Sequence, residues 1–545
     1  AGPTWVRQGS LIASTIKNVG EASSLGQPAD AAAGAIKLGN GTTAARLTYA
    51  GTGDTTDRVI DLAGTTGAGY LEQSGTGLLK FTSDLTYSGA GGKSLYLHGS
   101  TAGAGELAGV YGDGLPYTNK LIKTGTGQWT LSAANTYRGE TEIQEGTLTI
   151  AHPNAIPAAS TIRMTGTASR NAVLDLANDG AGQTEKNLTI GVGYRGTIAA
   201  GAGLDGAAVD HLFNEWSLSL TTVTVTRAAS VLSGTPTITV NTVNLSGGNS
   251  YRTTISPSDV DVRIGRAAVL SNGNLTKTLH LDGTSTGNVI TGAVYNGLSG
   301  STVVLDKTGT GTWTLLGSNT YSGATTVNGG TLALAGPDGA IPSTSSFTVN
   351  SGATLRLNNT AASNNTDRLG NAKALTLNGG TLAFSHTAGA ADYSETVGAV
   401  TVSGAGNAIA ASQASEGRTS TLSLASLTRT GNATLDFSGA GLGASDRNRI
   451  FIGGLQDGLI GFWTTYGGNG LAAYSAADGV YAGSTAATAL AARGPDSVVA
   501  DNPLFYGRIT EDGESGPVTL AGIPLTRAAA VVQAFVEVMK IDADR

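Results

Sequence analysis

The segment KTGTGTWTLLGSNTYSGATTVNGGTLALA, residues 307–335, decides the fold of this chain. It contains three short runs rich in Thr, Val and Leu, at 313–315, 325–327 and 331–334, which are typical of β-strands. The Gly, Asn and Ser residues between these runs are typical of tight turns. Because three strands and two corners fit within so short a segment, it predicts one coil of a β-solenoid.

The same unit recurs upstream at a constant offset. Residues 123–151 read KTGTGQWTLSAANTYRGETEIQEGTLTIA, and a weaker copy covers residues 73–101. The repeat-defining positions are Trp129, Tyr137, Gly139 and Gly146 in one strong copy and Trp313, Tyr321, Gly323 and Gly330 in the other. A unit that cannot bury its own apolar side must stack on its neighbours, so this repetition predicts a chain that grows in one dimension.

The motif GTGTWTL…NTYSGATTVNGGTLAL resembles the passenger-associated strand repeat of bacterial autotransporters, which also occurs in large Gly/Thr-rich surface proteins. The resemblance implies an all-β, right-handed parallel β-helix in the form of an elongated rod, exported and displayed outside the cell. The repeat motif is specific for fold and location and says little about activity. Because Trp129 and Trp313 lie at matched positions within apolar triplets, we expect them to fill the coil interior rather than contact a ligand.

The uniform composition favours one long body over several domains. Gly accounts for 81 of 545 residues, whereas charged residues are 13% and aromatic residues 6%. We expect a continuous β-solenoid over residues 1–482 and a C-terminal cap or assembly segment over 483–545. The run 525–539 within that segment is nearly all apolar, so we expect it to pack on the solenoid or on another molecule.

Charge and cysteine content narrow the range of partners. The net charge is −7 and no basic patch is visible, so nucleic acid is not an expected partner. The chain has no cysteine, which excludes disulfides and suits a passenger that crosses a membrane unfolded. No stretch approaches the roughly 18 apolar residues of a membrane span, so we expect the chain not to span a membrane.

Residues 204–217 interrupt the coil pattern. They include the sequence DHLFNEW, which has no Gly, and we expect a short helix or loop on the side of the solenoid. This stretch holds the one local acid–imidazole cluster and is our candidate ligand-contact loop, with Asp210, His211, Glu215 and Trp216 as its candidate residues. A catalytic dyad would also need a nucleophile held nearby, and the sequence identifies none.

The remaining titratable residues form no recognisable site. No two of the five histidines, His98, His152, His211, His280 and His386, lie at metal-ligand spacing, so we predict no metal and no cofactor. Glycan-cleaving β-helices gather acidic residues on one face, but the candidate acids Asp259, Asp261 and Asp306 are scattered along the chain. We therefore predict that the protein is not an enzyme.

Three functions follow from these observations. The repeats, without a catalytic cluster, favour an extracellular structural protein: a stalk, fibre or sheath subunit that self-assembles head to tail into a filament or surface layer. The first alternative is an adhesin that binds a host surface or a glycan through side loops such as 204–217. The second alternative is a β-helix polysaccharide lyase or hydrolase.

Overall fold

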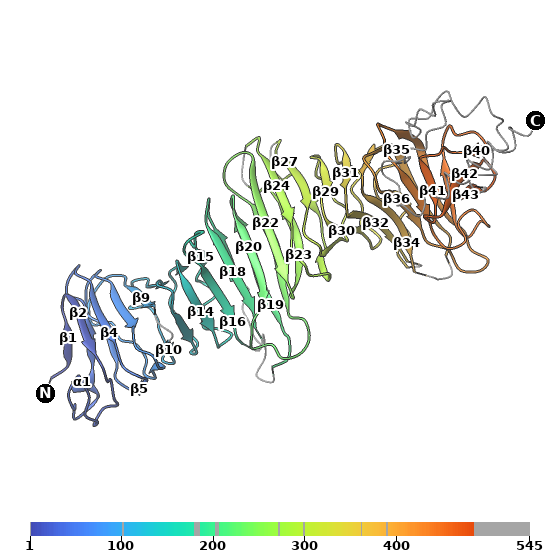
Figure 1. Cartoon of the computed structure of the whole chain (residues 1–545). Coiled ribbons are helices and arrows are strands. Elements are labelled where there is room, and N and C mark those ends of the chain that lie inside the picture. Colours follow the sequence, from blue (N-terminus) through green and yellow to red (C-terminus); the bar gives the residue numbers. More distant parts are fainter. Residues whose placement is uncertain are drawn as a thin grey trace, which may run out of the picture. The chain divides into compact units, whose positions relative to one another are not determined.

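A computed structural model describes residues 2–100, 103–178, 186–201, 206–270, 273–297, 300–360, 362–387 and 391–483. The predicted C-terminal segment therefore lies, from residue 484 onward, outside the described residues. The described chain is nearly all β, with one short helix, α1 (Ala31–Gly34), capped by Asp30 (Figure 1). It divides into two compact units, residues 1–291 with 296–303 and residues 292–295 with 304–545. A single continuous body over 1–482 stays a prediction.

The first unit is built from parallel strands that stack coil upon coil (Figure 1). Its first ladder consists of β2 (Gly9–Ala13), β4 (Ala45–Tyr49), β7 (Gly69–Gln73), β9 (Ser94–Gly99), β11 (Lys120–Lys123), β13 (Thr141–Ile143), β15 (Ile162–Met164), β17 (Lys186–Ile190), β19 (Asp210–Leu218), β21 (Thr237–Leu245), β23 (Asp261–Ala268) and β25 (Asn288–Ile290).

A second parallel ladder runs beside it. It consists of β5 (Asp54–Thr56), β8 (Leu79–Phe81), β10 (Ala104–Leu107), β12 (Gln128–Leu131), β14 (Gly146–Ile150), β16 (Ala172–Leu176), β18 (Arg195–Ala200), β20 (Thr222–Arg227), β22 (Tyr251–Ser258) and β24 (Thr276–Leu281). A short third ladder at the N-terminal coils pairs β1 (Thr4–Val6), β3 (Ile36–Leu38) and β6 (Ile60–Leu62).

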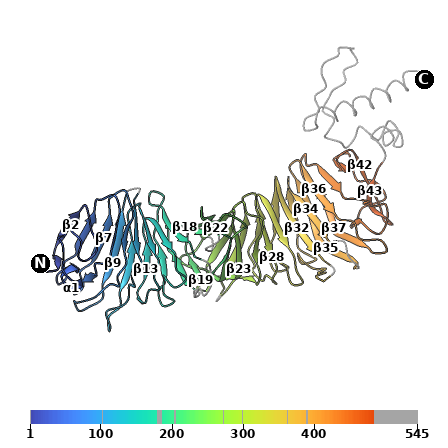
Figure 2. The same ribbon diagram turned by 90° about the horizontal axis from the view of Figure 1, so that it is seen from below.

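The second unit repeats this construction, and Figure 2 shows its strands from below. One ladder consists of β28 (Thr312–Leu315), β30 (Gly330–Leu334), β32 (Ala353–Asn359), β34 (Thr381–His386), β36 (Asn407–Ala411), β38 (Leu435–Ser438) and β41 (Thr464–Tyr466). The other consists of β27 (Thr302–Lys307), β29 (Thr325–Val327), β31 (Phe347–Asn350), β33 (Leu375–Asn378), β35 (Tyr393–Ser403), β37 (Ser420–Arg429) and β39 (Arg449–Ile452). The short strand β26 (Val294–Tyr295) also belongs to this unit.

Strand direction changes at the last coil of the second unit. There β42 (Gly470–Ser475) pairs antiparallel with β41, and also with β40 (Gly458–Leu459) and β43 (Gly479–Ala482). The parallel ladder of this unit thus ends against antiparallel strands within the described residues. Everywhere earlier in its two ladders the pairing is parallel, which confirms the predicted parallel β-solenoid.

The core follows from the alternation of side chains along each strand. In β12 and β14 the inward residues Trp129 and Leu148 lie at the same register position and are fully buried. Successive residues of a strand point to opposite faces, so the Thr residues between them point outward. The indole of Trp129 also lies over Gly105 of β10, where a Cβ atom would be 2.4 Å from the ring. Apolar residues stacked on apolar residues form the interior of each unit.

The repeated glycines at the corners have a steric cause. Gly146 and Gly330 have φ angles of +72° and +58°, which L-residues with a Cβ rarely adopt. A Cβ on Gly330 would also lie 2.3 Å from the carbonyl oxygen of Gly311 in the preceding coil. On Gly146 it would lie 2.3 Å from the carbonyl oxygen of Gly125. Only Gly therefore lets consecutive coils approach at this corner.

Candidate binding face

The repeat-defining aromatic residues lie inside the coils. Trp129 and Trp313 are fully buried, and Trp129 Nε1 donates to the carbonyl oxygen of His98 at 2.8 Å. The hydroxyls of Tyr137 and Tyr321, also fully buried, bond to Thr141 Oγ1 at 2.6 Å and Thr325 Oγ1 at 2.7 Å. Burial raises the pKa of both Tyr hydroxyls. These side chains are therefore not accessible to a ligand.

The repeat lysines are also internal. Lys123 Nζ donates to the carbonyl oxygens of Thr124, Gly125 and Glu145 at 3.0, 2.6 and 2.9 Å. Burial lowers the pKa of Lys123 to about 7. Lys307, its counterpart in the second copy, donates to the equivalent carbonyl oxygens. Lys93 and Lys277, at matched positions further upstream, are also buried and donate to main-chain carbonyl oxygens. These side chains donate to main-chain carbonyls at the corners, so their role is structural.

The predicted helix or loop at the acid–imidazole cluster is wrong for residues 210–218. These residues form β19, a nine-residue strand of the first ladder. Its alternation is interrupted by a bulge, because Lys186 pairs with Phe213 and Asn187 with Glu215. Because of the bulge, buried and exposed residues do not alternate regularly along this segment, so its sequence does not show the pattern expected of a strand.

The four candidate residues of this strand face in different directions. His211 and Trp216 are fully buried, and burial lowers the pKa of His211 to about 4. Asp210 and Glu215 lie on the outside, where Thr239 Oγ1 donates to Asp210 Oδ1 at 2.9 Å and Asn244 Nδ2 to Glu215 Oε1 at 3.3 Å. The structure thus separates the imidazole from the carboxylates. A ligand contact by Asp210 or Glu215 stays a prediction.

The described residues also contain an open groove in the first unit, with a volume of about 440 Å³. We call it the corner groove, because three successive corners of the first ladder line it. Its lining residues are Glu142 and Gln144 from β13 and its corner, Thr165, Thr167, Ser169 and Arg170 from the corner after β15, and Tyr194 from the corner between β17 and β18. No sequence motif indicated this site.

Glu142 is the fixed acidic group of the corner groove. Its Oε1 accepts from Gln144 Nε2 at 3.1 Å and from Thr165 Oγ1 at 3.2 Å. Its Oε2 pairs with Arg163 Nη2 at 3.0 Å, and Arg163 Nε lies 3.0 Å from Glu140 Oε1. Glu142 therefore shares one guanidinium with Glu140, and two further donors of the solenoid bond its carboxylate.

The opposite side of the groove is held by main-chain bonds. Thr167 and Arg170 exchange two hydrogen bonds, of 2.8 and 3.2 Å, across a tight turn. Arg195 N donates to the carbonyl oxygen of Gly166 at 2.7 Å, and the next coil donates Thr221 Oγ1 to the carbonyl oxygen of Tyr194 at 2.6 Å. These bonds fix the two corners relative to each other.

The corner that carries Tyr194 and the corner of the next coil expose large apolar side chains. The exposed fractions are 36% for Tyr194, 50% for Val192 and 41% for Leu220. Gly193 N donates to the carbonyl oxygen of Leu220 at 3.2 Å, which places these two corners together. The groove thus combines a polar floor with an exposed aromatic edge.

Within the described residues we searched for clusters of metal ligands and for membrane-spanning helices. Across the described ranges, no three His, Asp, Glu or Cys side chains gather where they could hold a metal ion. No helix in the described part of the chain is long and apolar enough to cross a membrane.

The paired strands and their Gly corners define a parallel β-solenoid. Residues 121–150 and 305–334 match the passenger-associated-transport-repeat family, which confirms the resemblance seen in the two strong copies. Two segments of the chain thus carry this passenger-associated repeat.

One similar curated protein is the adhesin BmaC autotransporter of Brucella suis biovar 1 (strain 1330). It is 38% identical over 143 residues, which cover 26% of this chain and 4% of that relative. The alignment thus spans only a small part of the relative's length. No solved structure matches the chain significantly.

Proposed function

We propose that this chain is an adhesive part of a surface passenger and that it contacts a host surface or a glycan. The similarity to an adhesin over 143 residues is the observation that supports this proposal most strongly. The passenger repeats and this relative indicate an exported protein at the cell surface.

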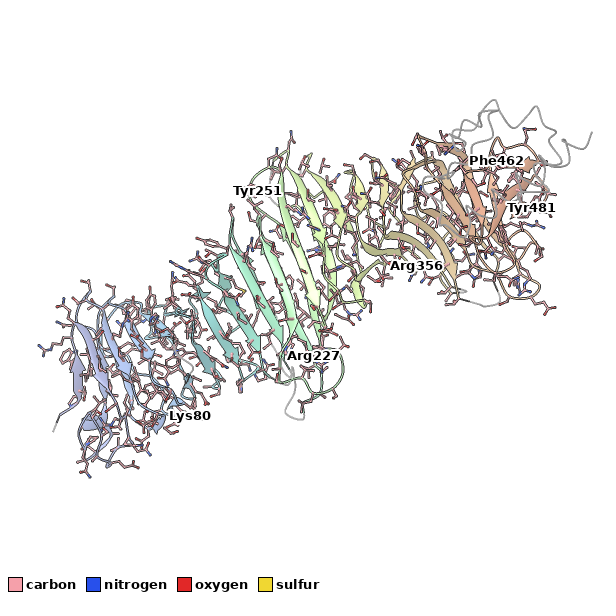
Figure 3. All side chains as sticks on the ribbon, in the orientation of Figure 1. Lys80, Arg227, Tyr251, Arg356, Phe462 and Tyr481 are labelled. Carbon is pink, nitrogen blue, oxygen red and sulfur yellow. The ribbon has the colours of Figure 1, made fainter. Side chains whose placement is uncertain are left out.

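The outer faces of the solenoid suit such a role, because polar side chains stabilise them without a covering layer. In the second unit, Asn378 Nδ2 donates to Asn350 Oδ1 at 3.0 Å, and Asn350 Nδ2 donates to Asn328 Oδ1 at 2.6 Å. In the first unit, Lys80, which Figure 3 labels, pairs with Glu106 of the next coil at 2.8 Å. Polar ladders of this kind leave the outer face accessible to a partner.

A bead-adhesion assay tests the proposal. Beads coated with the full chain should bind host cells saturably, and soluble chain should compete with them. Beads coated with heat-denatured chain are the control. Equal binding of native and denatured beads would argue against adhesion. A double variant, Asp210→Asn with Glu215→Gln, tests whether the outer carboxylates of β19 take part.

Self-assembly is a second proposal, supported by the N-terminal coils. Strands β1 and β2 each pair on one side only within the described residues, which leaves main-chain donors and acceptors on the other edge. A second copy that pairs with this edge would extend the ladder. Light scattering and electron microscopy should then show concentration-dependent oligomers. Dispersed monomers at high concentration would contradict self-assembly.

We also propose that the chain has no enzymatic role. Asp261 Oδ1 accepts from Gly287 N at 3.1 Å, and Asp306 Oδ1 accepts from Asn328 Nδ2 at 2.6 Å, so both carboxylates serve in bonds between coils. Incubation with acidic and neutral polysaccharides should therefore yield no cleavage product. A product that accumulates with time would favour the lyase or hydrolase alternative.

A further inference from the structure

We propose that the corner groove binds an acidic saccharide. The guanidinium of Arg170 would receive the ligand's carboxylate or sulfate, and the ring of Tyr194 would pack against a sugar face. The inference rests on the proposed adhesive function, because it names the ligand class through which the surface chain would adhere.

One charged side chain of the groove can receive an anion. Glu142 shares the Arg163 guanidinium with Glu140 and accepts two further hydrogen bonds, so its carboxylate is already bonded within the solenoid. The exposed side chain of Arg170 has no ion pair or hydrogen bond within the described residues. The groove therefore presents one cation without a partner. A guanidinium binds carboxylates and sulfates through paired, charge-assisted hydrogen bonds.

The uncharged lining favours a polyhydroxylated ligand. Thr167 Oγ1 and Ser169 Oγ lie 3.2 Å apart, and each hydroxyl both donates and accepts. Gln144 adds an amide with a carbonyl oxygen that remains available as an acceptor. The volume of about 440 Å³ suits one or two sugar rings. A purely apolar ligand would leave these polar groups without partners, which disfavours it.

Tyr194 adds the contact that distinguishes a saccharide from a simple anion. Tyr194 is 36% exposed, and exposed apolar residues occur in the same corner at Val192 and in the next coil at Leu220, whose carbonyl oxygen accepts from Gly193 N. The C–H face of a sugar ring can cover such an aromatic surface and remove it from water. Because Thr221 Oγ1 holds the main chain of Tyr194 at 2.6 Å, little ordering is needed on binding.

The groove lies on rigid elements. The Thr167–Arg170 turn and the bond from Arg195 N to Gly166 O connect its middle corner to the strand that follows. Lining side chains from three coils thus keep a fixed separation, set by the parallel ladder. A site held in this way loses less conformational entropy on binding than a free loop does.

Calorimetric titration of the full chain tests the proposal with three probes: a sialylated trisaccharide, a sulfated disaccharide and lactose. We expect the acidic saccharides to bind about tenfold or more tightly than lactose, with affinity that falls as salt rises. Arg170→Ala should remove this preference. Tyr194→Ala should weaken the binding of all the saccharides that bind.

The matched control is Arg356→Ala, which removes an exposed arginine of the second unit (Figure 3). It should leave binding unchanged, and thermal unfolding should show that all three variants are folded. Equal binding of lactose and the acidic probes, no binding of any probe, or unchanged binding by Arg170→Ala would overturn the proposal. If saccharides fail to bind but coated beads still adhere to cells, the groove proposal fails while the adhesive function stands. If saccharides bind but coated beads do not adhere to cells, the adhesive function fails while the groove proposal stands.

Discussion

Replacing Gly330 with Ala tests how closely consecutive coils approach. The new Cβ would lie 2.3 Å from Gly311 O and 2.6 Å from Gly309 O, and the φ angle of +58° would become strained. Strain in this left-handed region costs about 1–2 kcal/mol, and forced movement of packed atoms adds about 1–3 kcal/mol. We expect a loss of about 2–5 kcal/mol in the free energy of unfolding of the second unit.

Gly352→Ala is the matched control. Gly352 has a φ angle of +76°, but nothing lies within 4 Å of its Cβ position, so this variant bears only the backbone strain. Its loss should be about 1–2 kcal/mol. The difference between the two variants therefore measures the contact between coils.

Hydrogen exchange gives a local reading of the same contact. Thr331 N donates to the carbonyl oxygen of Gly311 at 3.1 Å, directly beside the substituted position. In Gly330→Ala this amide should exchange faster, whereas in Gly352→Ala it should stay protected. Equal destabilisation by the two substitutions, together with unchanged protection of Thr331, would refute the reasoning.

Three further predictions follow from buried or stacked groups. Burial lowers the pKa of Lys123 to about 7 from an ordinary 10.5, so the unfolded chain binds more protons between these pH values. The free energy of unfolding should therefore rise with pH by up to about 1.4 kcal/mol per unit in this window, and Lys123→Met should abolish that contribution in pH-dependent denaturant titrations. Trp129→Ala should cost about 3–5 kcal/mol by the same assay, whereas Trp5→Ala, with 43% of its side chain exposed, should cost far less. Asn350→Ala removes two bonds of the outer Asn ladder and should lower stability by about 1–2 kcal/mol.

Each of these predictions has a contrary result. A pH slope that persists in Lys123→Met would mean that other groups produce it. Equal losses for the two Trp variants would contradict the placement of Trp129 in the core. An unchanged Asn350→Ala variant would mean that solvent replaces the ladder bonds at no cost.

The coil architecture was predictable because each repeat encodes it locally. The Trp129 and Trp313 triplets alternate as strands must, and glycines occupy the corners where only a residue without Cβ fits. The parallel register then places the inward-facing residues of successive coils above one another. Side-chain alternation and corner chemistry predict each coil locally, and the recurrence of the unit predicts that the coils stack.

The candidate site was not predictable in the same way. The spacing between paired residues rises from 20, for Leu121 and Thr141, to 28, for Leu188 and Trp216, so the corners differ in length. Which corner side chains meet depends on these lengths, and the corners around Arg170 share no repeated motif. The lysines were missed for a related reason. A charged residue in a repeat resembles a surface residue until the carbonyl groups around it are known.

Oxidative cross-linking of paired cysteines tests the parallel register most directly, since the natural chain contains no cysteine. Thr326 of β29 and Thr348 of β31 lie opposite each other with outward-facing side chains. Adjacent strands are about 4.8 Å apart, within the Cα separation that a disulfide spans. The double variant Thr326→Cys with Thr348→Cys should cross-link rapidly, while Thr326→Cys with Ser346→Cys, shifted by two residues, should not. Preferential cross-linking of the shifted pair would contradict the register on which the whole solenoid depends.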